Sequence, residues 1–335
     1  MRSINHVEEN KLITKIKGRF SIYRLRNMGV LFALVILIIF FGFASHGKFT
    51  TLNNFLTVAR QISLVTIVGV GLTFVMITAN IDLAVGSYLA LSGVFVATIL
   101  EKGVPWFLSI IITMGAMALI GVLVGLIVAK QKLNSLIITL AMMGIARGVA
   151  LSYSNGSPIF IENDTFISLG TGYIGPIPIP VIIALSVLLI GQFLLKKTKL
   201  GRYIYAVGGN KEAAMTSGIN IDRITIIVFA ISGMLSGLSG TVLAGRLYSG
   251  NPTAGQGFEM DVIAAVVIGG TSLFGGFGNM WGTLIGAFTV GIIGNGLTIL
   301  HVNYFYQLIA KGLIIYIAVY IDRKTREIAL KGSTA

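Results

Sequence analysis

Charged side chains within apolar stretches are the first candidates for chemistry in this sequence. A charge at membrane depth is costly and invites a functional explanation. Such charges stand in or beside apolar stretches at Asp82, Arg147, Arg246, Glu259, Asp261 and Lys311. Arg147, near the middle of Leu133–Ser152, either pairs with Asp82, lines an aqueous path or makes an ordinary ion pair between helices. Asp82, Glu259 and Asp261 also fit helix starts, where a carboxylate accepts hydrogen bonds from free backbone N–H groups.

The sequence holds no motif of an enzyme active site. No G-x-x-x-x-G-K-[ST] nucleotide loop, H-E-x-x-H pair or Ser/His/Asp arrangement occurs. The chain has no Cys, and its three His residues lie far apart, at His6, His46 and His301. We therefore expect no catalytic residue, no metal and no cofactor in this chain. Any ATP hydrolysis would have to take place on a partner protein.

The composition is that of a polytopic membrane protein. Hydrophobic residues make up 55% and charged residues 11%, with a mean hydropathy of +0.90. Soluble domains have about 25% charged residues, so this chain lacks the polar surface that a globule in water needs. Small residues let membrane helices pack closely, and Gly121-x-x-x-Gly125 and Gly233-x-x-x-Gly237 indicate such contacts. We predict an all-α membrane protein that forms one helical bundle.

Apolar stretches of membrane length, about 20 residues each, predict about ten transmembrane helices. They are Met28–Ala44, Gln61–Ala79, Leu83–Leu100, Pro105–Ala129, Leu133–Ser152, Pro180–Leu195, Ile224–Leu247, Val262–Phe274, Met280–Leu300 and Phe305–Ile321. Residues 28–322 would form the transmembrane domain, between a basic N-terminal segment, 1–27, and a tail, 323–335.

Polar triplets open two of these spans. Asn80-Ile81-Asp82 and Glu259-Met260-Asp261 would begin their spans from opposite sides of the membrane in the ten-span arrangement. This would suit two five-helix halves of inverted topology. Because the first break is very short and Val262–Phe274 is short for a full span, eight spans with re-entrant pieces are an alternative.

Positive charges indicate how the spans are oriented, because cytoplasmic loops of membrane proteins carry an excess of Lys and Arg. Most of the 25 Lys and Arg residues fall in segments on one side, above all in 1–27 and Lys196–Arg223. Loops on the opposite side carry only Lys48, Arg60 and Lys102. Both termini are therefore expected in the cytoplasm, and the net charge of +13 calls for no nucleic-acid partner.

The longest polar interruption is Lys196–Arg223, which lies between two expected spans. Its backbone must lie in water or against another protein. Gly208-Gly209-Asn210 breaks the chain, Lys211–Ser217 follows as a short helix, and Gly218 is its expected stop. A short helix displayed between membrane spans favours a docking element. An ordinary amphipathic loop helix is the alternative.

Four blocks of sequence carry a resemblance to a known family. They are Ile77–Leu91, Leu133–Ala150, Leu200–Ile224 and Pro252–Gly286. Through them the chain resembles the permease subunit of bacterial ATP-binding-cassette importers for monosaccharides, in the ribose-type branch. The resemblance covers Gly29 to Asp322. It departs from the family pattern at Ala79-Asn80, where two glycines would be expected.

The resemblance implies a translocation subunit in the bacterial inner membrane that moves a monosaccharide inward by alternating access. Two permease subunits would form one pathway in the lipid bilayer. A cytoplasmic ATPase and an extracytoplasmic sugar-binding protein would be the other partners. The family's ATPase-coupling helix corresponds here to Gly209, Asn210, Glu212, Ala213, Ala214 and Gly218.

Polar residues of the spans are the candidates for the substrate pathway. They are Asn80, Asp82, Asn134, Thr139, Arg147, Asn295 and Gln307. Hydrogen bonds from such side chains suit a sugar that passes without a deep binding site. The alternative is an ion-coupled secondary transporter of a small polar solute, which Asp82, Arg147 and the inverted halves would favour. The sugar itself is expected to be selected largely by the separate binding protein.

Overall fold

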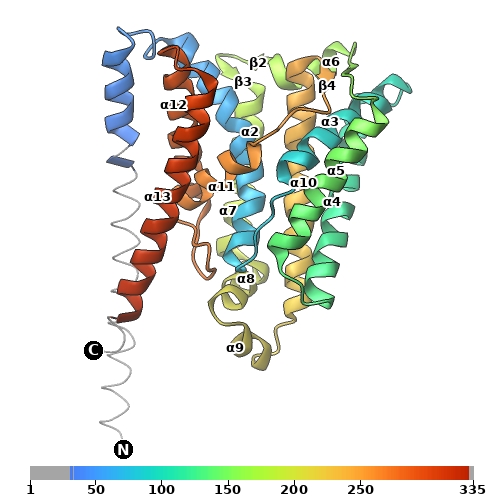
Figure 1. Cartoon of the computed structure of the whole chain (residues 1–335). Helices are drawn as coiled ribbons and strands as arrows, with labels where there is room; N and C mark the ends of the chain where they lie inside the picture. The colour runs from blue at the N-terminus through green and yellow to red at the C-terminus, as the bar shows by residue number, and fades with distance from the viewer. Residues whose placement is uncertain (1–30, 33, 332–335) are drawn as a thin grey trace, which may run out of the picture.

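The computed structural model describes residues 31, 32 and 34–331, and these form a bundle of helices (Figure 1). Within this part of the chain, seven helices are long and apolar enough to cross a membrane. They are α2 (Leu52–Ile77), α4 (Trp106–Lys130), α5 (Ser135–Tyr153), α7 (Ile179–Lys197), α10 (Ile221–Leu247), α12 (Met280–Ile299) and α13 (Tyr304–Lys331). The expected all-α polytopic fold is confirmed. The basic segment 1–27 and residues 332–335 of the tail lie outside the described residues.

The three other expected spans correspond to shorter helices. Leu34–Ala44 and α3 (Val85–Glu101) are apolar, and α11 (Phe258–Ile268) has only 11 residues. Non-helical chain precedes α3 and α11, so each of these segments is part helix and part turn or irregular backbone. The expected span Val262–Phe274 is thereby displaced toward the N-terminus, because Gly269 and Gly270 end α11.

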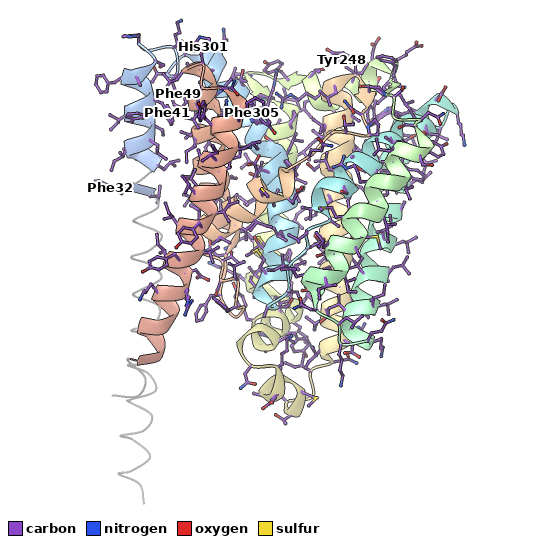
Figure 2. The ribbon with its side chains drawn as sticks, in the orientation of Figure 1. Phe32, Phe41, Phe49, Tyr248, His301 and Phe305 are labelled. Carbon is purple, nitrogen blue, oxygen red and sulfur yellow. The ribbon has the colours of Figure 1, made fainter. Side chains whose placement is uncertain are left out.

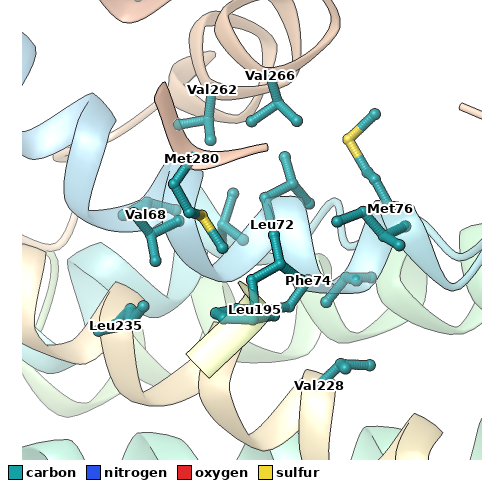
Figure 3. Packing of buried hydrophobic residues seen from close by; sticks show 14 of the residues in the cluster. Val68, Leu72, Phe74, Met76, Leu195, Val228, Leu235, Val262, Val266 and Met280 are labelled. Atoms are coloured by element: carbon teal, nitrogen blue, oxygen red, sulfur yellow. The ribbon is translucent and has the colours of Figure 1, made fainter. Parts of the chain in front are cut away.

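Helix α2 lies at the centre of the bundle. Most of its apolar stretch, 89%, is buried inside the structure, which is what a helix that is hydrophobic on every face requires. Figure 3 shows Leu72 and Phe74 of α2 among side chains of the surrounding helices. These neighbours include Leu195 of α7, Val228 and Leu235 of α10, Val262 and Val266 of α11, and Met280 of α12. Four helices therefore pack around α2.

The expected glycine contacts hold α4 against α10. A Cβ atom on Gly125 would lie 2.7 Å from the Ile226 Cα, and one on Gly237 would lie 2.9 Å from the Met117 Cγ. At Gly121 and Gly233, a Cβ atom would likewise overlap backbone atoms of the facing helix. These glycines therefore allow the backbones of α4 and α10 to approach closely.

The two ends of the bundle differ in structure (Figure 1). One end, here the α9 end, carries the short helices α8 (Lys199–Gly209) and α9 (Lys211–Thr216). The opposite end, the α6 end, carries α6 (Asp164–Thr171) and two small antiparallel sheets. Strand β1 (Ile159–Phe160) pairs with β4 (Ser249–Gly250), and β2 (Tyr173–Ile174) pairs with β3 (Ile177–Pro178).

The first and last described helices flank one side of the bundle. Phe41 and Phe49 pack with Ile62 of α2 and Ile292 of α12 near the α6 end (Figure 2). Only 6% of the apolar stretch of α13 is buried. A salt bridge of 2.9 Å joins Lys311 Nζ of α13 to Asp261 Oδ2 of α11. This outer helix is therefore attached to the bundle partly by an ion pair.

Candidate functional site

Two non-helical segments interrupt the helices of the bundle. Thr78–Ala84 runs from the end of α2 to α3, and Asn251–Gly257 runs from β4 to α11. They enter the bundle from opposite ends (Figure 1). Away from water, non-helical backbone leaves N–H and C=O groups that other parts of the protein must bind. The polar side chains near these segments therefore form the candidate site.

The first segment is held by its own side chains and by α10. Asp82 is fully buried, and its Oδ1 accepts a 3.0 Å hydrogen bond from the Ala84 N–H. Its Oδ2 accepts a 2.7 Å hydrogen bond from the Ser232 hydroxyl of α10. Asn80 donates to the Thr78 hydroxyl at 3.0 Å. As expected, Asp82 binds backbone at the start of a helix, and it also connects that helix start to α10.

The first turns of α5 bind the same segment. The Ile81 N–H donates to the Ser135 hydroxyl at 3.2 Å, and the Ile81 carbonyl accepts from the Thr139 hydroxyl at 3.4 Å. Asn134 lies just before these residues and caps α5, where its Oδ1 accepts from the Leu136 N–H at 2.9 Å. Both backbone groups of Ile81 are thus satisfied by small hydroxyl side chains of α5.

Arg147 of α5 binds the second segment. Its Nη1 donates to the carbonyls of Pro252 and Ala254, each at 2.7 Å. Its Nη2 makes a longer contact of 3.4 Å with the Gly86 carbonyl in the first turn of α3. A guanidinium has five N–H donors in a fixed plane, so a single side chain can hold several carbonyls at once. Arg147 therefore binds these carbonyls and does not pair with Asp82.

The start of α3 and the start of α11 meet beside Arg147. A Cβ atom on Gly86 would lie 2.5 Å from Glu259 Oε2 and 2.6 Å from the Gly255 carbonyl oxygen. Gly255 and Gly257 have positive φ angles of 69° and 74°, which glycine adopts without strain. Glycines at these points let the two helix starts approach closely.

One helix, α5, thus contacts both interrupted segments, with Ser135 and Thr139 near its start and Arg147 farther along. Five of the seven polar pathway candidates lie along this line: Asn80, Asp82, Asn134, Thr139 and Arg147. A groove of about 530 Å³ continues this line of polar residues, because Asn80 is one of its lining residues, together with Lys132, Met215 and Asn220. The groove reaches from the first non-helical segment to α9.

The other two candidates lie elsewhere. Asn295 of α12 accepts a 3.0 Å hydrogen bond from the Asn54 side chain of α2. Gln307 of α13 donates to the Val302 carbonyl at 3.0 Å and lines a cavity of about 10 Å³ with Asp261 and Lys311. Helices α12 and α13 stand on the other side of α2 from α5 (Figure 1). The structure therefore does not bring these two residues together with the other five.

The expected docking residues form α9 and its ends. Asn210 caps the helix, because its Oδ1 accepts a 3.0 Å hydrogen bond from the Ala213 N–H. Ala214 is buried, whereas Glu212 and Ala213 are exposed. Gly218 has a φ of 79° just after the helix. Gly209 has open space around it, which leaves it accessible.

Several residues of the candidate site were not expected from the sequence. Met215 projects from α9 with 62% of its surface exposed. Ser135 and Ser232 hold the first segment, although both lie in stretches that read as apolar helix. The only signal for these two is a hydroxyl in an apolar helix, and such hydroxyls usually bind a carbonyl one turn back. The backbone carbonyls of Pro252 and Ala254 give no signal in a sequence.

A bundle of long apolar helices with interrupted segments in its interior defines a multi-pass membrane protein of the permease class. Residues 54–319 match the family described as "Branched-chain amino acid transport system / permease component", and the chain belongs to this family. This range includes both non-helical segments, and it also includes the helices α5 and α9.

Relatives are similar over nearly their whole length. The chain is 46% identical over 294 residues to the ribose import permease protein RbsC of Haemophilus influenzae, which covers 87% of this chain and 91% of that protein. It is 45% identical over 298 residues to RbsC of Escherichia coli, covering 88% and 92%. The D-allose transport system permease protein AlsC of Escherichia coli is 40% identical over 298 residues, covering 88% and 91%. No solved structure matches the chain.

Proposed function

We propose that this chain is the membrane-spanning subunit of an ATP-driven importer that carries ribose or a closely related monosaccharide into the cell. The observation that carries the proposal is its identity of 45% and 46% to two ribose import permeases over nearly the whole of both proteins. The D-allose permease is less similar, at 40%. Ribose is therefore the first substrate to test.

The proposed topology has ten crossings, made of the seven long helices, Leu34–Ala44, and α3 and α11 with the non-helical segments that precede them. The opposite entry of Thr78–Ala84 and Asn251–Gly257 supports two inverted halves of five crossings each. Lysines and arginines of the α9 end, among them Lys130 and Lys132, support a cytoplasmic position for that end. Both termini would then lie in the cytoplasm, and the membrane would be the inner membrane of a bacterium.

The proposed pathway runs along α5. Only 22% of the apolar stretch of this helix is buried, and Ile137, Leu140 and Ile145 are exposed on it. A second copy of the chain that faced α5 would cover these apolar side chains. Asn80 and Thr139 are buried behind α5 and would come within reach of a sugar when the helices move apart during transport. Hydroxyl and amide groups there can exchange hydrogen bonds with a sugar, and the path alternates in access as the two subunits rock.

The energy would come from ATP hydrolysed on a separate subunit that binds α9. Glu212, Ala213 and Met215 give this helix a small exposed surface with one apolar side chain, which suits insertion into a groove. The flanking Asn210 and Gly218 fix where the helix begins and ends. A sugar-binding protein would deliver the substrate at the α6 end.

The geometry weakens two of the three features that favour the ion-coupled alternative, which are Asp82, Arg147 and the inverted halves. Asp82 is occupied by Ser232 and the Ala84 N–H, and Arg147 is occupied by backbone carbonyls.

The deciding experiment is purification of this chain with the proteins encoded beside it, followed by reconstitution in lipid vesicles. We expect ATP hydrolysis to rise when ribose and the binding protein are added, and ribose uptake to stop when ATP is withdrawn. Uptake should persist when the ion gradients are collapsed. Uptake that survives without ATP but is lost with the ion gradient would overturn the proposal.

A further inference from the structure

Helix α8 lies between the docking helix α9 and the membrane part of the chain. Its Ile204 and Val207 side chains are buried in the main apolar core, so α8 is fixed to the bundle. In α9, by contrast, Ala214 is the buried side chain. The Asn210 residue joins the two helices and caps α9. A force applied to α9 can therefore reach the bundle through α8, as well as through Ala214 and the turn that leads into α10.

Gly208, next to the end of α8, packs against two other parts of the backbone at once. A Cβ atom there would overlap the Ile77 carbonyl oxygen and lie 2.7 Å from the Gly276 nitrogen. These two groups also bind each other, because the Gly276 N–H donates to the Ile77 carbonyl at 2.8 Å. In the same place, a Cβ on Gly275 would lie 2.8 Å from Ala79 Cβ. Three backbone segments thus meet without an intervening side chain.

Tyr205 makes a second connection one turn earlier in α8. Its hydroxyl donates a hydrogen bond of 2.5 Å to the Gly278 carbonyl, in the turn between α11 and α12. Burial raises the pKa of Tyr205 to about 12, so the hydroxyl keeps its proton and remains a donor at neutral pH. The short distance is typical of a strong hydrogen bond from a hydroxyl.

The two segments that α8 contacts lead to the two interrupted parts of the pathway. Ile77 ends α2, and the chain continues directly into Thr78–Ala84. The turn that contains Gly276 and Gly278 follows α11, which in turn follows Asn251–Gly257. One short helix therefore contacts chain that leads to both non-helical segments.

We propose that α8 is a relay, in which Tyr205 and Gly208 transmit movement of α9 to both interrupted segments at once. This inference rests on the proposed function, because it presumes that an ATPase moves α9. It assigns a positioning role to two residues outside the docking surface. Docking and transmission should then be separable by mutation.

The test compares Tyr205→Phe with Tyr203→Phe in the whole importer, purified with its ATPase and supplied with ribose and the binding protein. Tyr203 is the matched control, since it lies on the same helix with 41% of its surface exposed. Tyr205→Phe removes one hydroxyl and keeps the ring. We expect the ATPase to co-purify normally and its basal rate to be unchanged, while ribose-stimulated hydrolysis and uptake fall about fivefold, as for the loss of about 1 kcal/mol. Tyr203→Phe should match the wild type.

A second variant, Gly208→Ala, adds a methyl group where no space exists and should lower stimulation further. Normal stimulation and uptake in Tyr205→Phe would overturn the inference, and so would loss of the ATPase from the purified complex, which would make Tyr205 part of docking. Ala213→Asp gives the contrasting pattern, with the ATPase lost from the complex. A wild-type complex that no sugar stimulates would overturn the proposed function, and the inference with it, before any variant is compared.

Discussion

The two non-helical segments of the bundle find partners for their backbone polar groups in different ways. Thr78–Ala84 carries its own carboxylate, and Asp82 binds backbone within the segment and a hydroxyl of α10. Asn251–Gly257 has no charged residue, and its carbonyls at Pro252 and Ala254 depend on the guanidinium of Arg147 from another helix. The charged group that binds the first segment therefore belongs to that segment, beside hydroxyls of α5 and α10, whereas the charged group that binds the second segment comes from another helix.

The two segments also differ in how deeply their side chains are buried. Thr78, Asn80, Asp82 and Ala84 are buried, whereas Thr253 and Gln256 of the second segment are exposed. The first segment, held by many buried groups, moves only with its surroundings. The second segment also has bonds of its own, between Asn251 and Thr253, but one charged side chain binds its carbonyls at Pro252 and Ala254. In a transporter with alternating access, we therefore expect the second segment to be the more mobile of the two.

The strongest test of this difference is Arg147→Ala. Hydrogen bonds to a charged donor contribute about 1.5–3 kcal/mol each, and this change removes two of 2.7 Å. We expect ribose uptake to fall below about a tenth of wild type, because two carbonyls at membrane depth lose their donor. Uptake in vesicles, normalised to the amount of inserted protein, measures the effect.

Arg147→Lys serves as the matched variant. Its ammonium keeps the charge but lacks the planar fork that reaches two carbonyls together. Uptake should therefore lie between those of Arg147→Ala and the wild type. If Arg147→Ala transported normally, the second segment would not depend on this side chain and the contrast between the segments would disappear.

Asp82→Ala should act on stability more than on a single step of transport. The change leaves the buried hydroxyl of Ser232 without its acceptor and removes the bond to the Ala84 N–H. Loss of a partner for buried groups costs about 1–3 kcal/mol. We expect a lower thermal unfolding midpoint in detergent and less inserted protein. Ser232→Ala keeps the bond between Asp82 and the Ala84 N–H and should cost less, so equal effects of the two changes would show that this bond within the segment adds no stability.

The helices and several local roles could be predicted from the sequence, because membrane spans require long apolar stretches and caps require particular side chains. Asp82 was expected at a helix start, and the short helix was expected at Lys211–Ser217, close to the observed α9 (Lys211–Thr216). The partners of Arg147 could not be predicted. They are backbone carbonyls, which every residue has, and they lie about a hundred positions away in the sequence.

For a related reason, the sequence could not predict which of the polar pathway candidates lie close together. Asn295 and Thr139 are both polar residues in apolar stretches, yet one binds Asn54 and the other faces Ile81. Which face of a helix meets which neighbour depends on how the helices pack. The close approach at Gly208 likewise depends on a turn far along the chain.

Gly86→Ala tests whether the two segments are joined at the start of α3. The added methyl group would lie 2.5 Å from Glu259 Oε2 and 2.6 Å from the Gly255 carbonyl oxygen, so the start of α11 would have to shift. Overpacking of this kind costs about 1–3 kcal/mol. We expect a several-fold loss of uptake with a modest fall in the unfolding midpoint. Gly115→Ala in α4 is the control, because its Cβ meets open space, and equal uptake in both variants would show that the segments move independently.

Thr139→Val should have the smallest effect. The Thr139 hydroxyl is 3.4 Å from the Ile81 carbonyl and equally far from the Leu136 carbonyl, so neither hydrogen bond is strong. Valine keeps the shape, and the Ile81 N–H keeps its bond to Ser135. We expect a change in unfolding free energy below about 1 kcal/mol and nearly normal uptake at saturating ribose. A large loss of uptake with an unchanged unfolding midpoint would instead show that this hydroxyl binds the sugar, and the first segment would then serve the substrate directly as well as holding the helices in place.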